Sequence, residues 1–288
     1  MRWWSVLLVA SLLGLGGAAS AAPVSPELRV IVIGLNEVDD GAYAGLYNKY
    51  VPALAGAEND ARDMAALLGA GAPLLGRDAT RPNVERAIKN AWSLEPGDML
   101  IVFYSGHGGR IPDPAYKSGF NSTWCLYDGQ LPGRQLGSWW TGFKKGVRIV
   151  VVSDSCHSGT VIRLAGWAGE KQIPDEVQKE VNNLHRSDYT RLQKGLPTPE
   201  QNAADTHAAV LLLAACGDEE TTKDGKPNGE FTDALMKQRS SAAFPSDYDA
   251  LRTAIERALH DRGRQQTPAL FPVGEEVYAL RRLRPFKP

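Results

Sequence analysis

Two short stretches of the chain hold residue types that can do nucleophilic chemistry. One is Asp154-Ser-Cys-His-Ser-Gly159 and the other is Tyr104-Ser-Gly-His-Gly-Gly109, and each closes an apolar run. Cys156 follows His107 by 49 residues, and a cysteine with a histidine about fifty residues upstream is a spacing found among thiol proteases. Ligands of open α/β sheets bind in the crevice at the carboxyl ends of the strands. We therefore expect the thiol and the imidazole to meet in one crevice.

The chemistry of this pair follows from the thiol. A cysteine at its ordinary pKa is mostly protonated at neutral pH, whereas the thiolate is the nucleophile. We expect His107 to activate Cys156, or to hold its thiolate as an ion pair, and then to protonate a leaving amine. His157 is the rival base, but adjacent strand residues point to opposite faces. The backbone N–H groups of Cys156 and Gly108 are the expected donors to an oxyanion.

The same alternation adds polar groups to the crevice. Because positions i and i+2 of a strand share a face, Asp154 lies on the side of Cys156, and Ser105 on the side of His107. If the two strands are neighbours, a carboxylate and a hydroxyl lie near the thiol and the imidazole. An isolated cysteine would be interpreted as a packed core thiol, and the paired glycine-flanked stretches argue against that interpretation.

Apolar runs alternate with segments of helical periodicity, which predicts a three-layer α/β/α sandwich with a mostly parallel central sheet. The expected strands are 28–34, 99–105, 147–153 and 208–215. The expected helices are 57–68, 83–92, 134–143 and 248–260.

Two connections interrupt this rhythm. Residues 111–133 are rich in Gly, Pro, Asn and Asp and indicate a long loop with a short strand at 123–127. Residues 157–206 form a polar insertion with an amphipathic helix near 176–192. Long connections inside a compact domain are usually functional or disordered.

Composition favours one domain. The chain has 288 residues, of which 43 % are hydrophobic, and no low-complexity stretch divides it. The formal net charge of −1 gives no reason to expect nucleic acid or an acidic membrane as a partner.

The first residues predict a signal peptide. Arg2 is followed by the apolar run 6–17 and by Ala19-Ser-Ala21, a small-x-small cleavage site. We expect residues 1–21 to be removed, which leaves 22–288 as the folded domain, exported to the periplasm or the exterior. An uncleaved anchor or a buried helix is the alternative.

The chain has three cysteines, Cys125, Cys156 and Cys216. Export implies an oxidising compartment, and an odd number leaves at least one thiol outside any disulfide, for which Cys156 is the candidate. A Cys125–Cys216 disulfide is one alternative for the others. Their apolar contexts favour buried cysteines that pack as small hydrophobes.

The two stretches around His107 and Cys156 resemble the catalytic motifs of metacaspases, especially the prokaryotic orthocaspases. The resemblance extends from about residue 28 to about residue 280 through segments that are weaker signals individually. These segments are Leu54-Ala-Gly-Ala-Glu-Asn-Asp60, Trp124-Cys-Leu-Tyr-Asp-Gly129, Gly229-Glu-Phe-Thr232 and Gln266-Thr-Pro268.

The resemblance implies a caspase-like fold, a monomer, and cleavage of protein or peptide substrates after arginine or lysine. It assigns His107 and Cys156 to the catalytic dyad. It assigns Asp60, Ser105 and Asp154 to a pocket for the basic side chain. Two partly desolvated carboxylates would attract a guanidinium or ammonium and disfavour an acidic side chain. Alternatively, Asp60 is a carboxylate favoured by a helix N-terminus, and Asp154 orients a histidine or caps a loop.

The chain departs from the resemblance where related proteins bind activating calcium through acidic residues. Leu131-Pro-Gly-Arg-Gln-Leu136 lacks the usual Asp-Asp pair, Asn121-Ser122 stands where an acidic pair is common, and Arg163 takes a ligand position. Calcium prefers several carboxylate oxygens, and Arg134 and Arg163 would repel it. We expect no cofactor and no calcium dependence of the usual kind.

The insertion 157–206 is a candidate for self-processing, because related enzymes can cut themselves in this region. A solvated surface loop explains its mixed charges equally well. The basic residues of the insertion are Arg163, Lys171, Lys179, Arg186, Arg191 and Lys194.

The sequence thus predicts a secreted cysteine endopeptidase specific for arginine or lysine. One alternative is a catalytically silent caspase-like module that binds or regulates. A thiol-based redox or acyl-transfer enzyme is disfavoured, since the chain has no Cys-x-x-Cys pair and no Gly-x-Ser-x-Gly elbow. A structural metal site is disfavoured because the cysteines and histidines lack ligand spacing.

Overall fold

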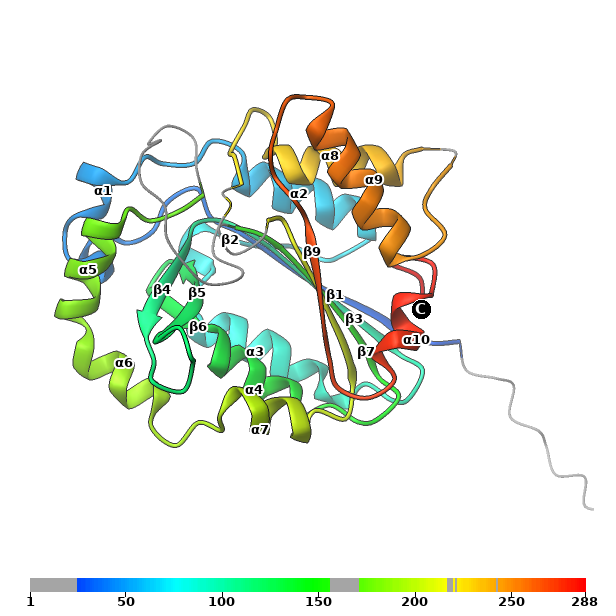
Figure 1. The fold of residues 1–288 in the computed structure, drawn as a ribbon, viewed down its shortest axis with the longest axis horizontal. Coiled ribbons are helices and arrows are strands. Elements are labelled where there is room, and N and C mark those ends of the chain that lie inside the picture. Colours follow the sequence, from blue (N-terminus) through cyan, green and yellow to red (C-terminus); the bar gives the residue numbers. More distant parts are fainter. Residues whose placement is uncertain (1–24, 156–170, 217–219, 221, 242) are drawn as a thin grey trace, which may run out of the picture.

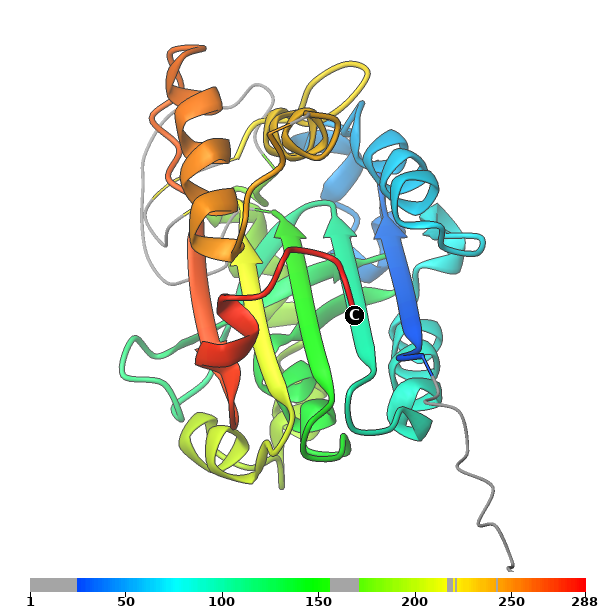
Figure 2. The same ribbon diagram turned by 90° about the vertical axis from the view of Figure 1, so that its right-hand side faces the viewer.

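A six-stranded sheet forms the centre of the molecule, in the order β2-β1-β3-β7-β8-β9. The computed structural model describes residues 25–155, 171–216, 220, 222–241 and 243–288. All neighbouring strands of this sheet are parallel except β8 and β9, which are antiparallel. Figure 2 shows the strands side by side. Their bounds are β1 Leu28–Gly34, β2 Leu74–Leu75, β3 Met99–Ser105, β7 Arg148–Asp154, β8 Ala209–Ala214 and β9 Ala269–Val273.

The four predicted strands are β1, β3, β7 and β8, and their bounds agree with prediction to within one residue. They are aliphatic runs that become buried because helices cover both faces of a parallel sheet. Strand β9 was missed. It contains Pro272, which argues against a central strand but is tolerated at the edge of a sheet, where β9 lies.

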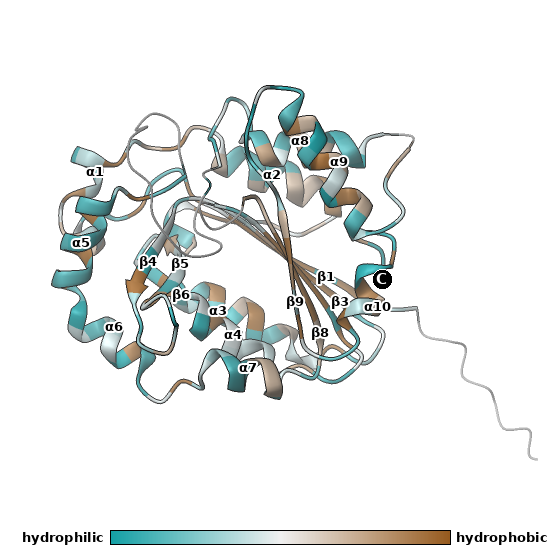
Figure 3. Cartoon of the chain, viewed as in Figure 1, coloured by the Kyte–Doolittle hydropathy of each residue, from teal (hydrophilic) through white to brown (hydrophobic). Residues whose placement is uncertain are grey.

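Helices cover both faces of the sheet and make a three-layer α/β/α sandwich (Figure 1). The helices of one face are α2 Ala57–Leu68, α8 Glu230–Arg239 and α9 Tyr248–His260. Those of the other face are α3 Arg81–Asn90, α4 Gly133–Trp140 and α7 Pro199–Asp205. Each face has its own cluster of buried apolar side chains. The strands are brown in the hydropathy colouring of Figure 3, whereas the helices carry much teal. The predicted fold class is confirmed.

The helix predictions for 57–68 and 248–260 are confirmed as α2 and α9, and the other two are shifted by one to three residues at their ends. Helix α3 begins two residues earlier than predicted because Thr80 caps it. The Thr80 Oγ1 accepts a hydrogen bond from the Asn83 backbone N–H at 3.4 Å, and Pro82 lies in the first turn. Shorter elements complete the chain: η1 Asp40–Tyr43, α1 Tyr47–Tyr50, η2 Gly76–Asp78, η3 Ala91–Ser93 and α10 Val277–Arg281.

A second, three-stranded antiparallel sheet replaces the loop predicted at 111–133. The strand predicted at 123–127 overlaps the middle strand of this sheet, whereas the loop predicted around it was wrong because two further strands pair with that strand. Trp124 joins the small sheet to the main one: its ring stacks on Tyr104 with centroids 4.6 Å apart, and its Nε1 donates to Ser153 Oγ at 3.0 Å. The strands are β4 Gly108–Pro112, β5 Phe120–Leu126 and β6 Gly129–Pro132.

The insertion after β7 contains three helices between residues 175 and 205. Two helices, α5 Asp175–Leu184 and α6 Arg186–Gln193, stand where one was predicted near 176–192. His185 separates them with a ψ of 17°, outside the helical range. Helix α5 packs on β4, where the Gln178 Oε1 accepts from the Arg110 N–H at 3.0 Å. Residues 156–170 lie outside the described residues.

Cys125 lies on β5 and Cys216 follows β8, and both are buried. No disulfide joins these two described cysteines, which agrees with their interpretation as small packed residues. The predicted signal peptide at 1–21 lies outside the described residues. Within the described ranges, no helix combines the length and the apolar character that crossing a membrane would need.

Strand β1 and helix α2 approach each other closely at Gly34. A Cβ atom on Gly34 would lie 2.5 Å from the Ala61 Cβ and 2.7 Å from the Ala57 carbonyl oxygen. We expect Gly34→Ala to lower the free energy of unfolding by about 1–3 kcal/mol through overpacking, measured by urea denaturation. A Cβ on Gly71 would meet nothing within 4 Å, so Gly71→Ala is the control and should stay within about 0.5 kcal/mol. Equal losses in both variants would contradict this account of the contact.

Candidate active site

The carboxyl ends of β3 and β7 lie side by side, because the two strands are parallel neighbours with Ser105 paired to Asp154. The Gly106 N–H donates to the Asp154 carbonyl oxygen at 3.4 Å just beyond this pair. His107 and Cys156 each follow a member of the pair by two residues in the sequence. Cys156 lies outside the described residues, so the structure describes this arm of the site as far as Ser155.

Asp60 is buried in the first turn of α2 and points at the end of β3. Its Oδ2 accepts a hydrogen bond from Ser105 Oγ at 2.7 Å, and its Oδ1 accepts one from the Gly229 N–H at 2.9 Å. The position of Asp60 therefore agrees both with a carboxylate near a helix N-terminus and with a carboxylate grouped with Ser105.

Asp154 is buried at the end of β7. Its Oδ1 accepts from Thr222 Oγ1 at 3.0 Å, and its Oδ2 accepts from Thr232 Oγ1 at 2.7 Å. The hydroxyls of Ser153 and Ser155 lie 3.0 Å from each other, and Ser153 contacts Trp124 on the far face of the sheet from Asp154. The strand alternation expected at this end of β7 holds through Ser155.

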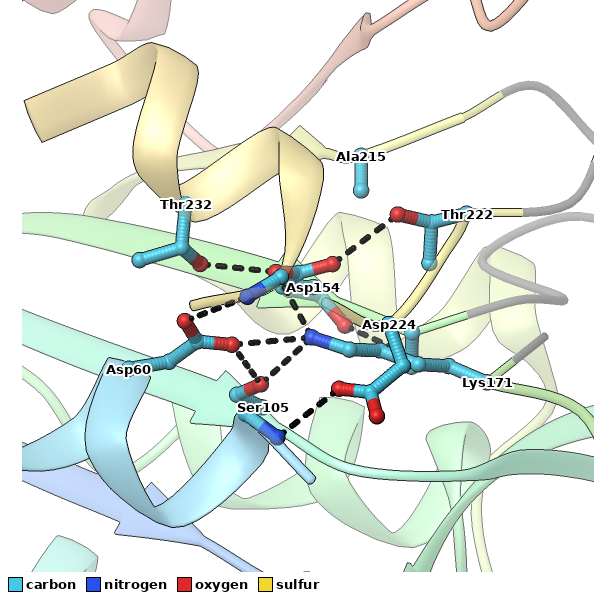
Figure 4. A network of polar contacts seen from close by, with 12 residues as sticks. Asp60, Ser105, Asp154, Lys171, Ala215, Thr222, Asp224 and Thr232 are labelled. Atoms are coloured by element: carbon cyan, nitrogen blue, oxygen red, sulfur yellow. Dashed lines mark hydrogen bonds and ion pairs between the residues drawn. The ribbon is translucent and has the colours of Figure 1, made fainter. Parts of the chain in front are cut away.

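A lysine from the insertion fills the space between the two carboxylates (Figure 4). The Lys171 Nζ lies 2.9 Å from Asp60 Oδ2 and 2.8 Å from Asp154 Oδ2, and it donates to Ser105 Oγ at 2.8 Å. Its side chain has no exposed surface. The sequence had placed Lys171 among the basic residues of the insertion, and nothing in the spacing distinguished it from the other five.

The charges of this cluster perturb one another strongly. Burial by itself would lower the pKa of the Lys171 ammonium, but the carboxylates of Asp154 and Asp60 outweigh it and raise the pKa above its ordinary value. Burial, with the charge of Asp154 adding to it, raises the pKa of Asp60 against the opposing effect of Lys171. The two buried carboxylates therefore stabilise the cationic form of the lysine between them.

The backbone around Lys171 is also held on both sides. Its carbonyl oxygen accepts from the Gly108 N–H at 2.9 Å, and its N–H donates to the Thr222 carbonyl oxygen at 3.1 Å. The Ile173 N–H donates to the Gly108 carbonyl oxygen at 3.2 Å. The Gly108 N–H, which the sequence analysis predicted as an oxyanion donor, thus donates to the Lys171 carbonyl oxygen.

His107 is buried next to this segment. Its Nε2 lies 3.2 Å from the Pro52 carbonyl oxygen, its ring meets the Tyr47 ring edge-on at 5.7 Å between centroids, and its Nδ1 has no partner among the described residues. Burial lowers the pKa of His107 to about 4, and the charge of Lys171 contributes, while contacts with the Pro52 and Gln172 backbone oppose the shift. His107 is therefore neutral at pH 7, the state that a general base requires.

The pocket wall includes residues to which the sequence assigned no role. Gly229 borders the ammonium so closely that a Cβ atom there would lie 2.5 Å from Lys171 Nζ. Gln266 Nε2 donates to Thr222 Oγ1 at 3.0 Å and to the Ala215 carbonyl oxygen at 2.6 Å, which braces the wall. The segments with Gly229, Thr232 and Gln266 were noticed only through the family resemblance, because their contacts join distant parts of the chain.

The loop between Thr222 and Gly229 is tied to the start of α2. The carboxylate of Asp224 accepts hydrogen bonds from the Ala55 and Gly56 N–H groups, at 2.5 and 3.0 Å. This tie brings the wall that carries Thr222 and Gly229 against the helix that carries Asp60.

Two described residues from which we predicted the lack of calcium dependence, Asn121 and Arg134, lie together around Asp113. The Arg134 guanidinium pairs with buried Asp113 at 2.9 Å from Nε to Oδ2, and the Asn121 Nδ2 donates to the same Oδ2 at 3.1 Å. Asp113 therefore already has a cationic partner. Among the residues that the structure describes, no group of three or more His, Cys, Asp or Glu side chains is placed to hold a metal ion.

Comparison with known sequences identifies the family. The family model of the caspase domain, peptidase C14, matches residues 30–274. Metacaspase-1 of Mycosarcoma maydis is 30 % identical over 216 residues, which cover 61 % of this chain and 53 % of that protein. Metacaspase-3 of Trypanosoma cruzi (strain CL Brener) is 29 % identical over 159 residues, which cover 50 % of this chain and 38 % of that protein. The chain thus spans about half the length of these curated relatives, or less.

Two solved structures share the architecture. The crystal structure of a Geobacter sulfurreducens protein has a TM-score of 0.78 at 34 % identity and covers 91 % of this chain and 99 % of that one. Caspase-1 from Spodoptera frugiperda, with a TM-score of 0.54, 13 % identity and coverage of 87 % and 88 %, shares the fold alone. By its fold and by the family match over residues 30–274, this chain belongs to the caspase-domain family of cysteine peptidases, with metacaspases among its relatives.

Proposed function

We propose that this chain is an endopeptidase that cleaves after arginine or lysine, with Cys156 as nucleophile and His107 as base. The observation that carries the proposal is the buried pair of carboxylates, Asp60 and Asp154, which already holds an ammonium group beside His107. A substrate lysine would make the same contacts. A substrate arginine would bring its planar guanidinium to the two carboxylates.

In the proposed reaction, His107 takes the proton of the Cys156 thiol, and the thiolate attacks the carbonyl carbon that follows the basic residue. The N–H groups of Gly108 and Cys156 stabilise the negative oxygen that forms. His107 then protonates the leaving amine, and water hydrolyses the thioester. The neutral state of His107 supports its role as a base.

We propose that the activity needs no calcium. The support is the buried pairing of Arg134 with Asp113, next to Asn121, where the calcium-binding relatives have acidic residues. A guanidinium at this position repels a divalent cation.

We also propose that residues 1–21 direct export and that the mature chain acts as a monomer outside the cytoplasm. The support for export is the apolar run 6–17 after Arg2, followed by the small residues before position 22. N-terminal sequencing of the exported protein tests the cleavage site, and size-exclusion chromatography tests the oligomeric state.

The central test uses residues 22–288 with fluorogenic peptides that end in Arg, Lys or Asp. We expect hydrolysis of the Arg and Lys peptides only, equal rates in calcium and in a chelator, and a loss of at least about a thousandfold in Cys156→Ala. Cleavage after Asp would contradict the assignment of the pocket. If calcium is required, the interpretation of Arg134 is wrong. No hydrolysis by folded protein with a reactive thiol would favour the silent binding module.

Asp60→Asn removes one charge from the pocket and keeps its shape. Since removing one partner of a buried charge pair costs about 2–5 kcal/mol, we expect kcat/KM for the Arg peptide to fall about 100-fold. The matched control is Asp63→Asn, an exposed residue on the same helix that accepts from Asn228, which should change kcat/KM less than about twofold. An unchanged rate in Asp60→Asn would count against the pocket.

The low pKa of His107 predicts a pH dependence of stability. Below pH 6.5 the unfolded histidine takes up a proton that the folded one, with its pKa of about 4, does not. His107 therefore lowers the free energy of unfolding as the pH falls below 6.5, by about 2 kcal/mol between pH 7 and pH 5. Urea unfolding of Cys156→Ala, compared with Cys156→Ala/His107→Gln, should show this loss only in the first variant. The same slope in both would contradict the burial of His107.

A further inference from the structure

We infer that the chain has a second binding site, which takes a small uncharged molecule of one or two fused rings with a single polar group. The site is a cavity of about 250 Å³ between the sheet and the helices α4 and α7. The described residues that line it do not include Asp60, Ser105, Asp154 or Lys171. The inference is independent of the proposed peptidase activity.

The walls of the cavity are mostly apolar. Strands β5 to β9 form one side, and α4 and α7, which cover the face of the sheet opposite α2, form the other (Figure 1). Where the two helices line the cavity they include Gly137 and Ala203, whose small size leaves room for a ligand. A ring placed here would be withdrawn from water, which favours binding. The large apolar side chains of the lining are Trp124, Leu131, Leu136, Trp140, Leu212 and Phe271.

The volume of the cavity limits the size of the ligand. An apolar cavity of about 150 Å³ inside a protein binds benzene, so about 250 Å³ accommodates two fused rings. Ala203 and Phe271 line the cavity and are also exposed to solvent. A ligand can therefore enter between α7 and β9.

Two serines of β7 and its end leave one hydroxyl proton without an acceptor. Ser153 and Ser155 both line the cavity, and their Oγ atoms lie 3.0 Å apart. The Trp124 Nε1 donates to the Ser153 Oγ at 3.0 Å. Because one hydroxyl of the pair donates to the other, the second proton has no acceptor among the described residues. A ligand oxygen would accept it.

Asn202 provides a complementary group from α7. Its Nδ2 donates to the Arg134 carbonyl oxygen at 3.0 Å, whereas its Oδ1 is buried and has no donor among the described residues. Such atoms are rare in folded proteins, because they lose hydration without a replacement. A ligand hydroxyl can donate to this oxygen or accept from the serine pair, so an uncharged hydroxyl suits both partners.

A charged ligand does not suit the cavity. Arg134 is the one charged residue of the described lining, and its guanidinium is already paired with Asp113 at 2.9 Å. An ionic group would therefore lose its hydration without an opposite charge free to pair with it.

The first test measures binding to residues 22–288 by isothermal titration calorimetry. The probe is 2-naphthol, and naphthalene-2-sulfonate is its charged counterpart with the same rings. We expect one site for 2-naphthol with a dissociation constant of about 1 mM or lower. The sulfonate should bind at least about tenfold more weakly, because its charge would be buried unpaired. Equal affinity for both compounds, or no binding of 2-naphthol by folded protein, would overturn the inference and leave the proposed peptidase activity intact.

The second test locates the site. Ala203→Trp places an indole at the mouth of the cavity, whereas Ala204→Trp changes an exposed neighbour on α7 outside the described lining and is the matched control. Both positions are exposed, so both variants should fold, which circular dichroism would check. We expect Ala203→Trp to weaken 2-naphthol binding at least about tenfold and Ala204→Trp less than about twofold. Equal binding by the two variants would place the ligand elsewhere and contradict the inference.

The third test concerns the polar group of the ligand. Asn202→Leu keeps the approximate size of the side chain and removes its unpaired acceptor. We expect 2-naphthol to bind about fivefold more weakly, as the loss of one hydrogen bond predicts, in protein whose thermal unfolding shows that it is folded. An unchanged dissociation constant would contradict the part of the inference that gives the ligand a polar group bound by Asn202.

Discussion

Asp60 and Asp154 bring two carboxylates into a part of the protein that water does not reach, at the ends of α2 and β7. Burying such charges costs much free energy unless they are hydrogen-bonded and paired with an opposite charge. The surrounding structure compensates them with hydroxyls from Ser105, Thr222 and Thr232, and with the Gly229 N–H. These donors leave one place between the carboxylates, and a cation fills it. Much of the local architecture follows from this requirement.

The fold surrounds the two carboxylates by bringing strands, helix and loop close together. Parallel pairing of β3 with β7 places Ser105 opposite Asp154. The absence of a side chain at Gly34 lets α2 reach the sheet, and its absence at Gly229 leaves space for the ammonium. The Asp224 carboxylate fastens the far wall to the start of α2. The polar pocket is therefore assembled from the start of α2, the ends of β3 and β7, and the loop that leads into α8.

Burial lowers the pKa of His107, and the charge of Lys171 between the two carboxylates contributes to the same shift. With Lys171 in place, the imidazole is buried, near a positive charge, and neutral. The sequence left two possibilities open, activation of a thiol or an ion pair with a thiolate, and this environment supports a neutral base. An imidazolium would be disfavoured there by both burial and charge.

Local patterns accounted for a large part of the fold. Aliphatic runs and helical periodicity identified β1, β3, β7, β8, α2 and α9, because those elements are buried on defined faces and their apolar spacing records it. Only part of β5 was predicted in the small sheet; β4, β6 and β9 were missed, because β4 and β6 are short, β9 carries Pro272, and all three depend on pairing with other strands. The split of the insertion into α5 and α6 depends on one residue, His185, whose conformation the periodicity does not reveal.

The sequence alone determined the chemistry available to this protein: a cysteine and a histidine at strand ends, two aspartates, and a family resemblance that the family match supports. Only the tertiary structure decided that Lys171, out of six basic residues in the insertion, lies between Asp60 and Asp154. The reason is physical. The end of a buried strand can be recognised from the local pattern of hydrophobic residues. The buried ion pair between Lys171 and Asp60 joins residues 111 positions apart, so it depends on how the chain packs.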